Sequence, residues 1–114
     1  MKNKATKNTK TRIKAKNTKT RINYDIKKDN GKLRMDLVPP EWLLEASKVL
    51  TFGLQKGYKE NSWRDVEINR YIASTHRHLN AFQMGELTDP ESGLSHLSHL
   101  LTNVGFLLSL TRKS

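Results

Sequence analysis

Apolar residues recur every three or four positions in three segments of the chain, which is the spacing of one face of an α-helix. The first segment follows Pro39 and Pro40, because proline disfavours helix before it and is tolerated in a first helical turn. We predict a helix over residues 40–53, with Gly53 and Gly57 around its end. Its predicted buried stripe comprises Leu43, Ala46, Ser47, Leu50 and Leu54.

Two further helices are predicted, over residues 66–84 and from Ser92 to about residue 110, joined by ELTDPE after Gly85. We expect Asp89 or Ser92 to cap the last helix. The second stripe comprises Ile68, Tyr71, Ile72, Thr75, Leu79 and Phe82. The third comprises Leu94, Leu97, Leu101, Val104 and Leu108. Three helices without a convincing strand predict an all-α fold, a small helical bundle.

The third predicted helix carries more apolar surface than a bundle of three helices needs. Leu100, Phe106, Leu107 and Leu110 lie off its main stripe. A helix that is apolar nearly all round is buried on both sides. In so short a chain we expect the second side to contact a partner subunit, so that homo-oligomerisation, as a dimer or tetramer, completes the bundle.

Charge divides the chain into two regions. Residues 1–22 contain nine Lys or Arg and no acid, whereas residues 23–114 carry only +1 of the net charge of +10. The basic region repeats NTKTRI and has too few apolar residues to offset its ordering entropy. We therefore predict a disordered basic tail over residues 1–23 and a folded domain over residues 24–114. The tail either contacts nucleic acid or is a solvated segment without a role.

Composition excludes several classes of protein. The chain has no cysteine, which excludes disulfides and thiolate metal sites. No apolar run approaches the roughly 20 residues of a membrane span, and no apolar segment follows the N-terminal lysines as in a secretory signal. A near-neutral folded domain also argues against a nucleic-acid-binding module. We expect a cytoplasmic protein without membrane contact.

His96, His99 and Asn103 point the same way on the third predicted helix, opposite its leucine stripe. If that side is buried, each of them must find a hydrogen-bond partner. The three side chains either form the polar wall of a site for a phosphate, a base or a metal, or they are satisfied structural residues at a subunit interface.

Glu86, Asp89 and Glu91 crowd the start of this helix. The helix dipole favours carboxylates there, which explains one or two of them. Three acids beside two histidines also suit an oxygen-rich site for Mg²⁺ or Mn²⁺. On the first helix, Glu41 and Glu45 face away from the stripe, where they belong either to a solvated face or to such a site.

Cations occur on the second helix and in the segment before the first. Arg77 lies opposite the second stripe and His78 on its flank, so both can reach a phosphate unless they are a surface arginine and a packed histidine. Lys32, Arg34 and Asp36 alternate, and in an extended segment they share one face that suits an anionic ligand.

The loop after the first helix contains residues that suit a base and a sugar. These are Lys56, Tyr58, Asn61 and Trp63. They supply a cation, an amide and aromatic surface for stacking. The alternative is an ordinary surface loop whose tryptophan packs into the core.

These segments occur together as GKLRMDLVPP, KGYKENSW, RHLNAF followed by GE, and DPESGLSHLSHLLTN. In them the chain resembles a phage-rich family of dATP/dGTP diphosphohydrolases, similar to the MazG-like all-α NTP pyrophosphohydrolases. The resemblance runs from about Asp29 to Leu108. It implies a metal-dependent enzyme that cleaves dGTP or dATP to the monophosphate and pyrophosphate in phage nucleotide metabolism, in the cytoplasm of an infected bacterial host.

For this reaction we hypothesise roles for the candidate residues. Mg²⁺ or Mn²⁺ would be held by Glu45, Glu86, Asp89 and Glu91, or a subset of them. The catalytic group would comprise His96, His99, Arg77 and His78, with a histidine that positions the water or donates to pyrophosphate. The substrate would be bound by Lys32, Arg34, Asp36, Lys56, Tyr58, Asn61, Trp63 and Asn103.

One departure from MazG-like enzymes keeps a second function open. Those enzymes hold Mg²⁺ with an ExxE pair and an ExxD pair on facing helices. Here Glu86 and Asp89 match ExxD in letters but lie in a connection, and Glu41 and Glu45 are too far apart for ExxE. In this second function the chain does not cleave the nucleotide. It binds the nucleotide and sequesters it against a nucleotide-signalling defence.

Overall fold

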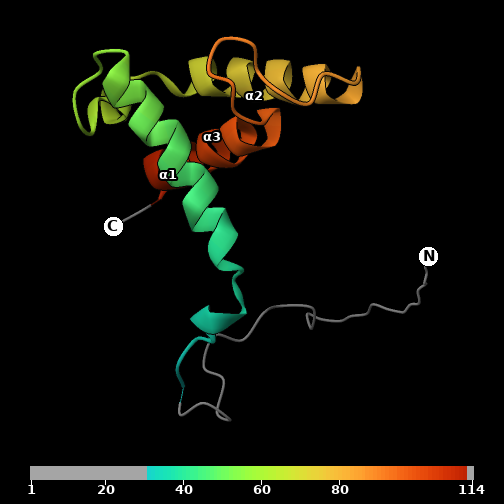
Figure 1. The fold of residues 1–114 in the computed structure, drawn as a ribbon. Coiled ribbons are helices and arrows are strands. Elements are labelled where there is room, and N and C mark those ends of the chain that lie inside the picture. The colour runs from blue at the N-terminus through green and yellow to red at the C-terminus, as the bar shows by residue number, and fades with distance from the viewer. Residues whose placement is uncertain (1–30, 113–114) are drawn as a thin grey trace, which may run out of the picture. The chain divides into compact units, whose positions relative to one another are not determined.

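The computed structural model describes residues 31–112, whose regular structure is helical apart from one isolated bridge (Figure 1). Residues 31–37 belong to one compact unit and residues 38–112 to a second. In the first unit, Met35–Leu37 form the 3-10 helix η2. Arg34 binds Asp36 there through two contacts of 2.8 and 2.9 Å. The predicted disordered tail lies outside the described residues.

Helix α1 spans Pro40–Gln55 and begins where the two prolines predict. Gly57 follows its end with a φ of 101°, a conformation that favours glycine. The partly buried residues of α1 are Glu45, Ala46, Val49, Phe52 and Gly53. Of the predicted stripe only Ala46 is confirmed, and the prediction was wrong for Leu43, Ser47, Leu50 and Leu54, which are exposed. A helical period identifies residues that share a face but not which face meets a neighbour.

The 3-10 helix η3, Ser62–Asp65, precedes helix α2, Ile68–Gln83. Gly85 follows α2 with a φ of 96°, as expected of a residue that ends a helix. The partly buried residues of α2 are Tyr71, Ser74, Thr75, His78, Ala81 and Phe82. Half of the predicted stripe is therefore confirmed, but Ile68, Ile72 and Leu79 are exposed and His78 lies on the inward side.

The loop that connects α2 to helix α3, His96–Thr111, is closed by backbone hydrogen bonds between its two sides. Asp89 N donates to Leu94 O at 2.8 Å, and His96 N donates to Leu87 O at 2.9 Å. The N-cap of α3 is Ser95, whose side chain accepts from the backbone N–H of the residue two positions later. The predicted caps, Asp89 and Ser92, were wrong because both side chains accept hydrogen bonds from backbone N–H groups within the loop.

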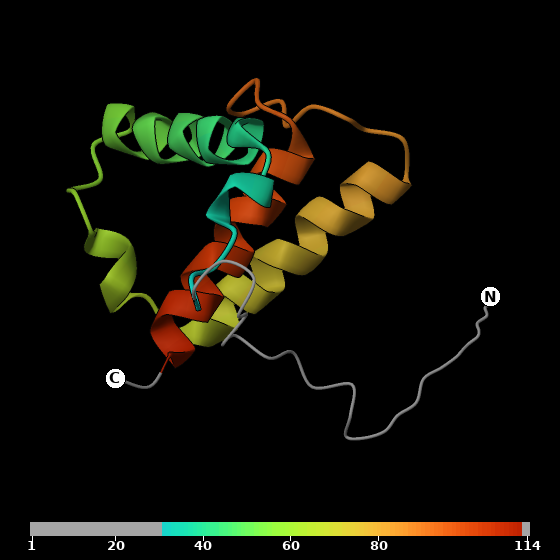
Figure 2. The ribbon, with the colours of Figure 1, turned by 90° about the horizontal axis from the view of Figure 1, so that it is seen from below.

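Helix α3 is central in the second unit (Figure 2). It packs against α1, α2 and η3, whereas α1 and α2 do not pack against each other. Towards its C-terminal end, Phe106 stacks on Trp63 and lies against Tyr71, with ring centroids 4.7 and 4.8 Å apart. The Tyr71 hydroxyl donates to the Trp63 carbonyl at 2.9 Å. This aromatic cluster anchors η3 to α2 and α3.

The buried side chains of the described residues are all polar, and all lie on α3: His96, Ser98, Thr102 and Asn103. The apolar residues Leu97, Leu101, Val104 and Leu108 are exposed. The predicted inward face of α3 was therefore wrong, because its polar side faces α1 and α2. The all-α fold with three main helices is confirmed for residues 31–112. None of these helices is long and apolar enough to cross a membrane.

Candidate functional site

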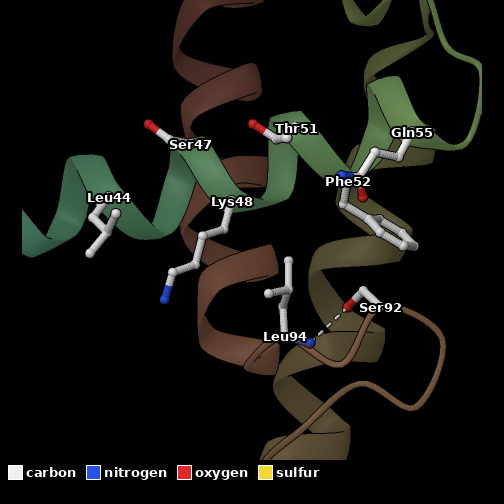
Figure 3. Close-up of a pocket in the computed structure, with 8 residues that line it drawn as sticks. All are labelled: Leu44, Ser47, Lys48, Thr51, Phe52, Gln55, Ser92 and Leu94. Carbon is white, nitrogen blue, oxygen red and sulfur yellow. Dashed lines mark hydrogen bonds between the residues drawn. The ribbon is translucent and has the colours of Figure 1, made fainter.

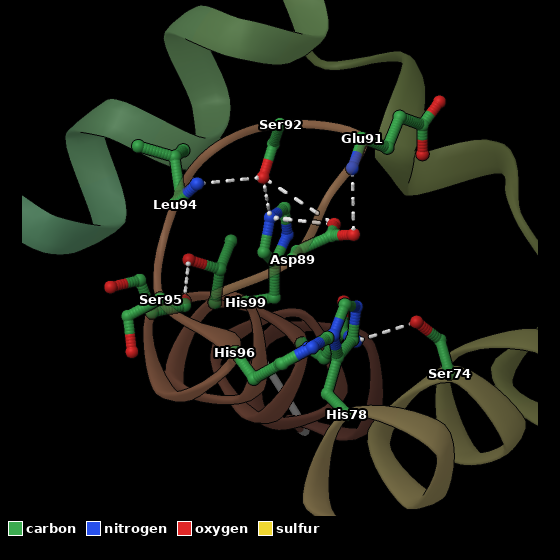
Figure 4. A network of polar contacts seen from close by, with 12 residues as sticks. Ser74, His78, Asp89, Glu91, Ser92, Leu94, Ser95, His96 and His99 are labelled. Carbon is green, nitrogen blue, oxygen red and sulfur yellow. Dashed lines mark hydrogen bonds and ion pairs between the residues drawn. The ribbon is translucent and has the colours of Figure 1, made fainter. Parts of the chain in front are cut away.

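A chain of hydrogen bonds links α2, α3 and the loop between them (Figure 4). Nδ1 of His78 lies 2.8 Å from Nδ1 of His96. Nε2 of His96 lies 2.8 Å from Oε1 of Glu86, whose side chain is 53% exposed. His96 itself is buried. The chain therefore runs from the interface of the two helices to the surface.

His99 lies one helical turn further along α3 and contacts the same loop. Its Nε2 lies 2.7 Å from the Ser92 hydroxyl and 3.3 Å from Oδ2 of Asp89. The other Asp89 oxygen accepts from the backbone of Glu91 at 3.1 Å, and the Ser92 hydroxyl accepts from the backbone of Leu94 at 3.1 Å. The loop backbone thus fixes both side chains that face His99.

His78, Asp89 and His99 form a cluster, which we call the His–Asp cluster. Their donor atoms lie within 4.8 Å of one another, and no other group of three or more His, Cys, Asp or Glu side chains in residues 31–112 could share a metal. The rings of His78 and His99 stack with centroids 4.6 Å apart and planes 3° from parallel. The structure thus joins three predicted site residues from α2, the loop and α3.

The two imidazoles of the cluster favour their neutral forms. Burial lowers the pKa of His78, and the neighbouring His99 and His96 lower it further. Burial also lowers the pKa of His99, although Asp89 opposes that change. An unperturbed imidazole has a pKa of about 6.5, so both rings are neutral at neutral pH. A neutral imidazole offers one lone pair for a proton or a metal.

Ser92, His99 and Asp89 do not form a nucleophilic triad. In a triad, the serine and the carboxylate bind opposite nitrogens of the histidine, so that the carboxylate orients the ring. Here both groups reach the same nitrogen, Nε2 of His99. The arrangement can hold a proton or a cation at that nitrogen but cannot activate the serine hydroxyl in the usual way.

The four carboxylates expected to bind a metal do not gather at one point. Glu45 on α1 accepts from the Ser98 hydroxyl at 2.6 Å and from Lys48 at 2.9 Å. These bonds, the one from Ser98 foremost, lower the pKa of the Glu45 carboxyl. Glu86 contacts His96 instead. The second unit therefore brings only Asp89, among the four, into the His–Asp cluster.

Glu91 and Lys56, predicted as a metal ligand and a phosphate-binding cation, form an ion pair at 2.7 Å. This contact with Glu91 raises the pKa of the Lys56 ammonium. The ammonium also lies 5.5 Å from the ring centres of Phe52 and Tyr58. A phosphate that binds Lys56 must therefore compete with a carboxylate.

The predicted base and sugar residues are not assembled around the His–Asp cluster. Trp63 packs against Phe106, two turns along α3 from His99, and Arg64 covers its ring at 4.3 Å. Asn61 adopts a left-handed conformation with a φ of 64° where η3 begins. The tryptophan is thus packed into the aromatic cluster, which was the alternative interpretation.

Within the second unit, Arg77 and Asn103 lie outside the His–Asp cluster. Arg77 is exposed on α2. Asn103 is buried and donates to the Ser74 hydroxyl at 2.9 Å, across the contact between α3 and α2. Lys32, Arg34 and Asp36 belong to the first unit. Their roles as substrate ligands stay predictions.

An open groove of about 400 Å³ lies between α1 and the loop before α3 (Figure 3). Lys48 and Phe52 of α1 line one side, and Ser92 and Leu94 of the loop line the other. Because Ser92 also contacts His99, a ligand in the groove would lie beside the His–Asp cluster.

Sequence reasoning missed the serines that complete these networks, which are Ser74, Ser92 and Ser98. Ser98 and Thr102 share the polar side of α3 with the histidines. The helical period of α3 could therefore have identified these two residues as part of the same face. Ser92 was considered only as a cap. Its contact with His99 depends on the closure of the loop, for which the sequence offers no periodic signal.

Comparison with known proteins assigns the chain to a family. A family model described as dATP/dGTP diphosphohydrolase, N-terminal, matches residues 23–114. A dATP/dGTP diphosphohydrolase of Salmonella phage PMBT28 is 32% identical over 85 residues, which are 75% of this chain and 29% of that relative. The chain thus spans less than a third of the relative's length. No solved structure matches it. Because the family match includes all three helices and the His–Asp cluster, the chain belongs to the dATP/dGTP diphosphohydrolase N-terminal family.

Proposed function

We propose that this chain takes part in the hydrolysis of a purine deoxynucleoside triphosphate, dATP or dGTP, to its monophosphate and pyrophosphate. The family match and the name of the phage relative support this reaction. Within the chain, the observation that carries the proposal is the His–Asp cluster, which sets two neutral imidazoles and a carboxylate beside an open groove.

In this reaction a water oxygen attacks the α phosphorus, the bond from that phosphorus to the bridging oxygen breaks, and pyrophosphate leaves. The water must lose a proton, which a neutral imidazole can accept. In the metal-free chain His78 suits this role as general base because its other nitrogen is linked through His96 to the Glu86 carboxylate. A carboxylate at the end of such a chain stabilises the imidazolium that forms. His96 and Glu86 are then positioning residues.

Mg²⁺, one of the two expected cofactors, does not fit the donors that the described residues bring together. Mg²⁺ favours oxygen ligands in octahedral geometry. The His–Asp cluster offers two imidazole nitrogens and one carboxylate oxygen, and three of the four predicted acids are engaged elsewhere. No step of the proposed reaction therefore passes through Mg²⁺.

Two lysines, one lining the groove and one paired with the loop before α3, are suited to the phosphates of the substrate. Lys48 lines the groove and pairs with Glu45, and Lys56 pairs with Glu91 at the same loop. Exposed ion pairs of this kind contribute little to stability. A triphosphate carries more negative charge than one carboxylate, so it can displace either acid from its lysine.

We also propose that the chain functions as a homo-oligomer. No apolar side chain of residues 31–112 is fully buried, and large apolar residues are exposed on all three helices. Apolar burial is the main favourable term in folding, so a domain that leaves these faces in water would be marginally stable. A second copy supplies matching apolar faces, as is typical of symmetric dimers.

A product assay tests the proposed reaction. The purified chain is incubated with each dNTP and NTP, with several divalent metals, and the nucleotides are identified by chromatography and mass spectrometry. We expect dAMP or dGMP together with pyrophosphate. His78→Gln should remove this activity, whereas His76→Gln, an exposed histidine on the same helix, should retain it. Nucleotides that stay intact under every condition, whether bound or free, would contradict the proposal.

A further inference from the structure

We propose that His78, Asp89 and His99 bind one divalent transition-metal ion of the zinc class, through two imidazole nitrogens and one carboxylate oxygen. Their donor atoms lie within 4.8 Å of one another. The side chains come from α2, the loop and α3, so the site forms only when these elements are packed together. This site goes beyond the proposed hydrolysis, because an ion can bind there whether or not a nucleotide is cleaved. A bound ion would occupy the nitrogen of His78 that accepts the proton in the metal-free chain, so His78 would then be a ligand and not the base.

The hydrogen-bond chain determines which nitrogen of His78 is available. The Glu86 carboxylate can only accept, so Nε2 of a neutral His96 must carry its proton. Nδ1 of His96 then has a lone pair and accepts from Nδ1 of His78. Nε2 of His78 is left with a lone pair and has no hydrogen-bond partner among residues 31–112. Metal-binding histidines are usually oriented by such a bond on their other nitrogen.

The loop presents the second and third donors. The backbone of Glu91 binds Oδ1 of Asp89, which leaves Oδ2 towards Nε2 of His99 at 3.3 Å. Two donor atoms that each lie about 2.1 Å from a tetrahedral zinc ion are about 3.4 Å apart. The spacing of this pair therefore already suits a shared ion.

Metal binding requires two changes in the cluster, and the first is that the Ser92 hydroxyl, 2.7 Å from Nε2 of His99, moves away from that nitrogen. The rings of His78 and His99 are stacked, with planes 3° from parallel. An imidazole lone pair lies in the plane of its ring, so two stacked parallel rings cannot direct their lone pairs to one point. The second change is that one ring must rotate about its side-chain bonds when an ion binds. Loss of the stacking is thus a specific signature of the bound state.

The donor set selects the class of ion. Imidazole favours zinc, iron, nickel and copper, whereas Mg²⁺ favours oxygen donors. Affinity for mixed nitrogen and oxygen sites rises from Mn²⁺ towards the later metals. Three protein ligands also leave a position open for a further ligand, as in catalytic rather than structural zinc sites. We therefore expect Zn²⁺ to bind more tightly than Mn²⁺, and Mg²⁺ to bind least.

Equilibrium dialysis of the full chain against Zn²⁺, Mn²⁺ or Mg²⁺, with metal content measured by mass spectrometry, tests the site. We expect one Zn²⁺ per chain. Asp89→Asn and His99→Gln should each weaken zinc binding by roughly tenfold or more. Two matched substitutions at exposed positions, Asp65→Asn and His76→Gln, should leave it unchanged. No nucleotide is present, so the outcome is independent of the product assay.

Three results of the dialysis would overturn the inference. These are the absence of zinc binding, tighter binding of Mg²⁺ than of Zn²⁺, and equal zinc affinity in the cluster variants and their matched controls. Circular dichroism shows whether each variant keeps its helices.

A measurement on the unaltered chain does not depend on how the variants fold. Zn²⁺ should shift the imidazole ¹⁵N resonances of His78 and His99 and leave those of His76 in place. A shift confined to His76, or equal shifts of all four histidines, would show that the ion binds elsewhere.

Discussion

Nδ1 of His78 and Nδ1 of His96 lie 2.8 Å apart across the contact between α2 and α3. Between two neutral rings at this distance, one nitrogen must donate and the other accept. Glu86 decides which, because its carboxylate accepts from the opposite nitrogen of His96. The tautomer of a histidine inside the fold is thus set by an acid at the surface.

This relationship predicts the tautomers of two histidines. At about pH 8, where imidazoles are neutral, His78 should carry its proton on Nδ1 and His96 on Nε2. Long-range ¹H–¹⁵N spectra distinguish these forms. Glu86→Leu should reduce the Nε2 form of His96, whereas Glu60→Leu, at an exposed position, should not. A proton found on Nδ1 of His96 in the unaltered chain would refute the assignment.

The lowered pKa values of His78 and His99 predict how stability depends on pH in the metal-free chain. Their folded-state pKa lies below the value of about 6.5 expected in the unfolded chain. As the pH falls below that value, the unfolded chain takes up protons first. The free energy of unfolding should therefore be highest above that pH and fall as the pH drops through the folded-state pKa.

Urea unfolding with a chelator, at steps from about pH 8 to pH 5, measures this dependence. His78→Gln should flatten the loss of stability in this range, and His76→Gln should leave it as in the unaltered chain. A free energy of unfolding that rises as the pH falls would contradict the prediction.

Asn103 should contribute to stability more than to substrate binding. It is buried and donates to Ser74 at 2.9 Å. Asn103→Ala should lower the free energy of unfolding by about 1–3 kcal/mol, the usual cost of a lost buried hydrogen bond. Asn80→Ala, at an exposed position of α2, should change it by less than about 0.5 kcal/mol. If the two variants are equally stable and only Asn103→Ala raises the KM for dNTPs, Asn103 binds substrate instead.

The exposed apolar faces predict the oligomeric state. Light scattering with size-exclusion chromatography should give at least twice the chain mass of 13.1 kDa. Leu108 is 68% exposed on α3, and Leu108→Asp should lower the measured mass to that of one chain. Lys59→Asp, in the loop after α1, serves as the matched control. A stable monomer in the unaltered chain would remove the second copy from the proposal.

Sequence reasoning placed the helices better than their faces. Proline and glycine mark the start of α1 and the ends of α1 and α2, because these residues restrict or free the backbone locally. The inward faces of the helices depend on partners elsewhere in the chain. The hydrogen bond from Ser98 on α3 holds Glu45 on the inward side of α1. The helical period of α1 alone does not predict this contact. The family resemblance was also confirmed.

In the candidate site, too, features within one helix were predicted and features that depend on distant contacts were not. The shared face of His96 and His99 was predicted, since both lie on one helix and follow its period. The separation of Glu86 and Glu91 from the cluster was not, because it depends on the closure of the loop between Leu87 and His96. Loop residues follow no helical period, so the sequence does not indicate the direction of their side chains.

The polar interior also fixes how the helices align lengthwise. Ser98 is matched to Glu45 on α1, while His96 and Asn103 are matched to His78 and Ser74 on α2. Leucines can slide past one another at little cost, but a shift of one helix by a single turn would break these matched pairs together and leave buried polar atoms without partners. The bonds along α3 thus act as a register, which sets where each helix must stop against its neighbour.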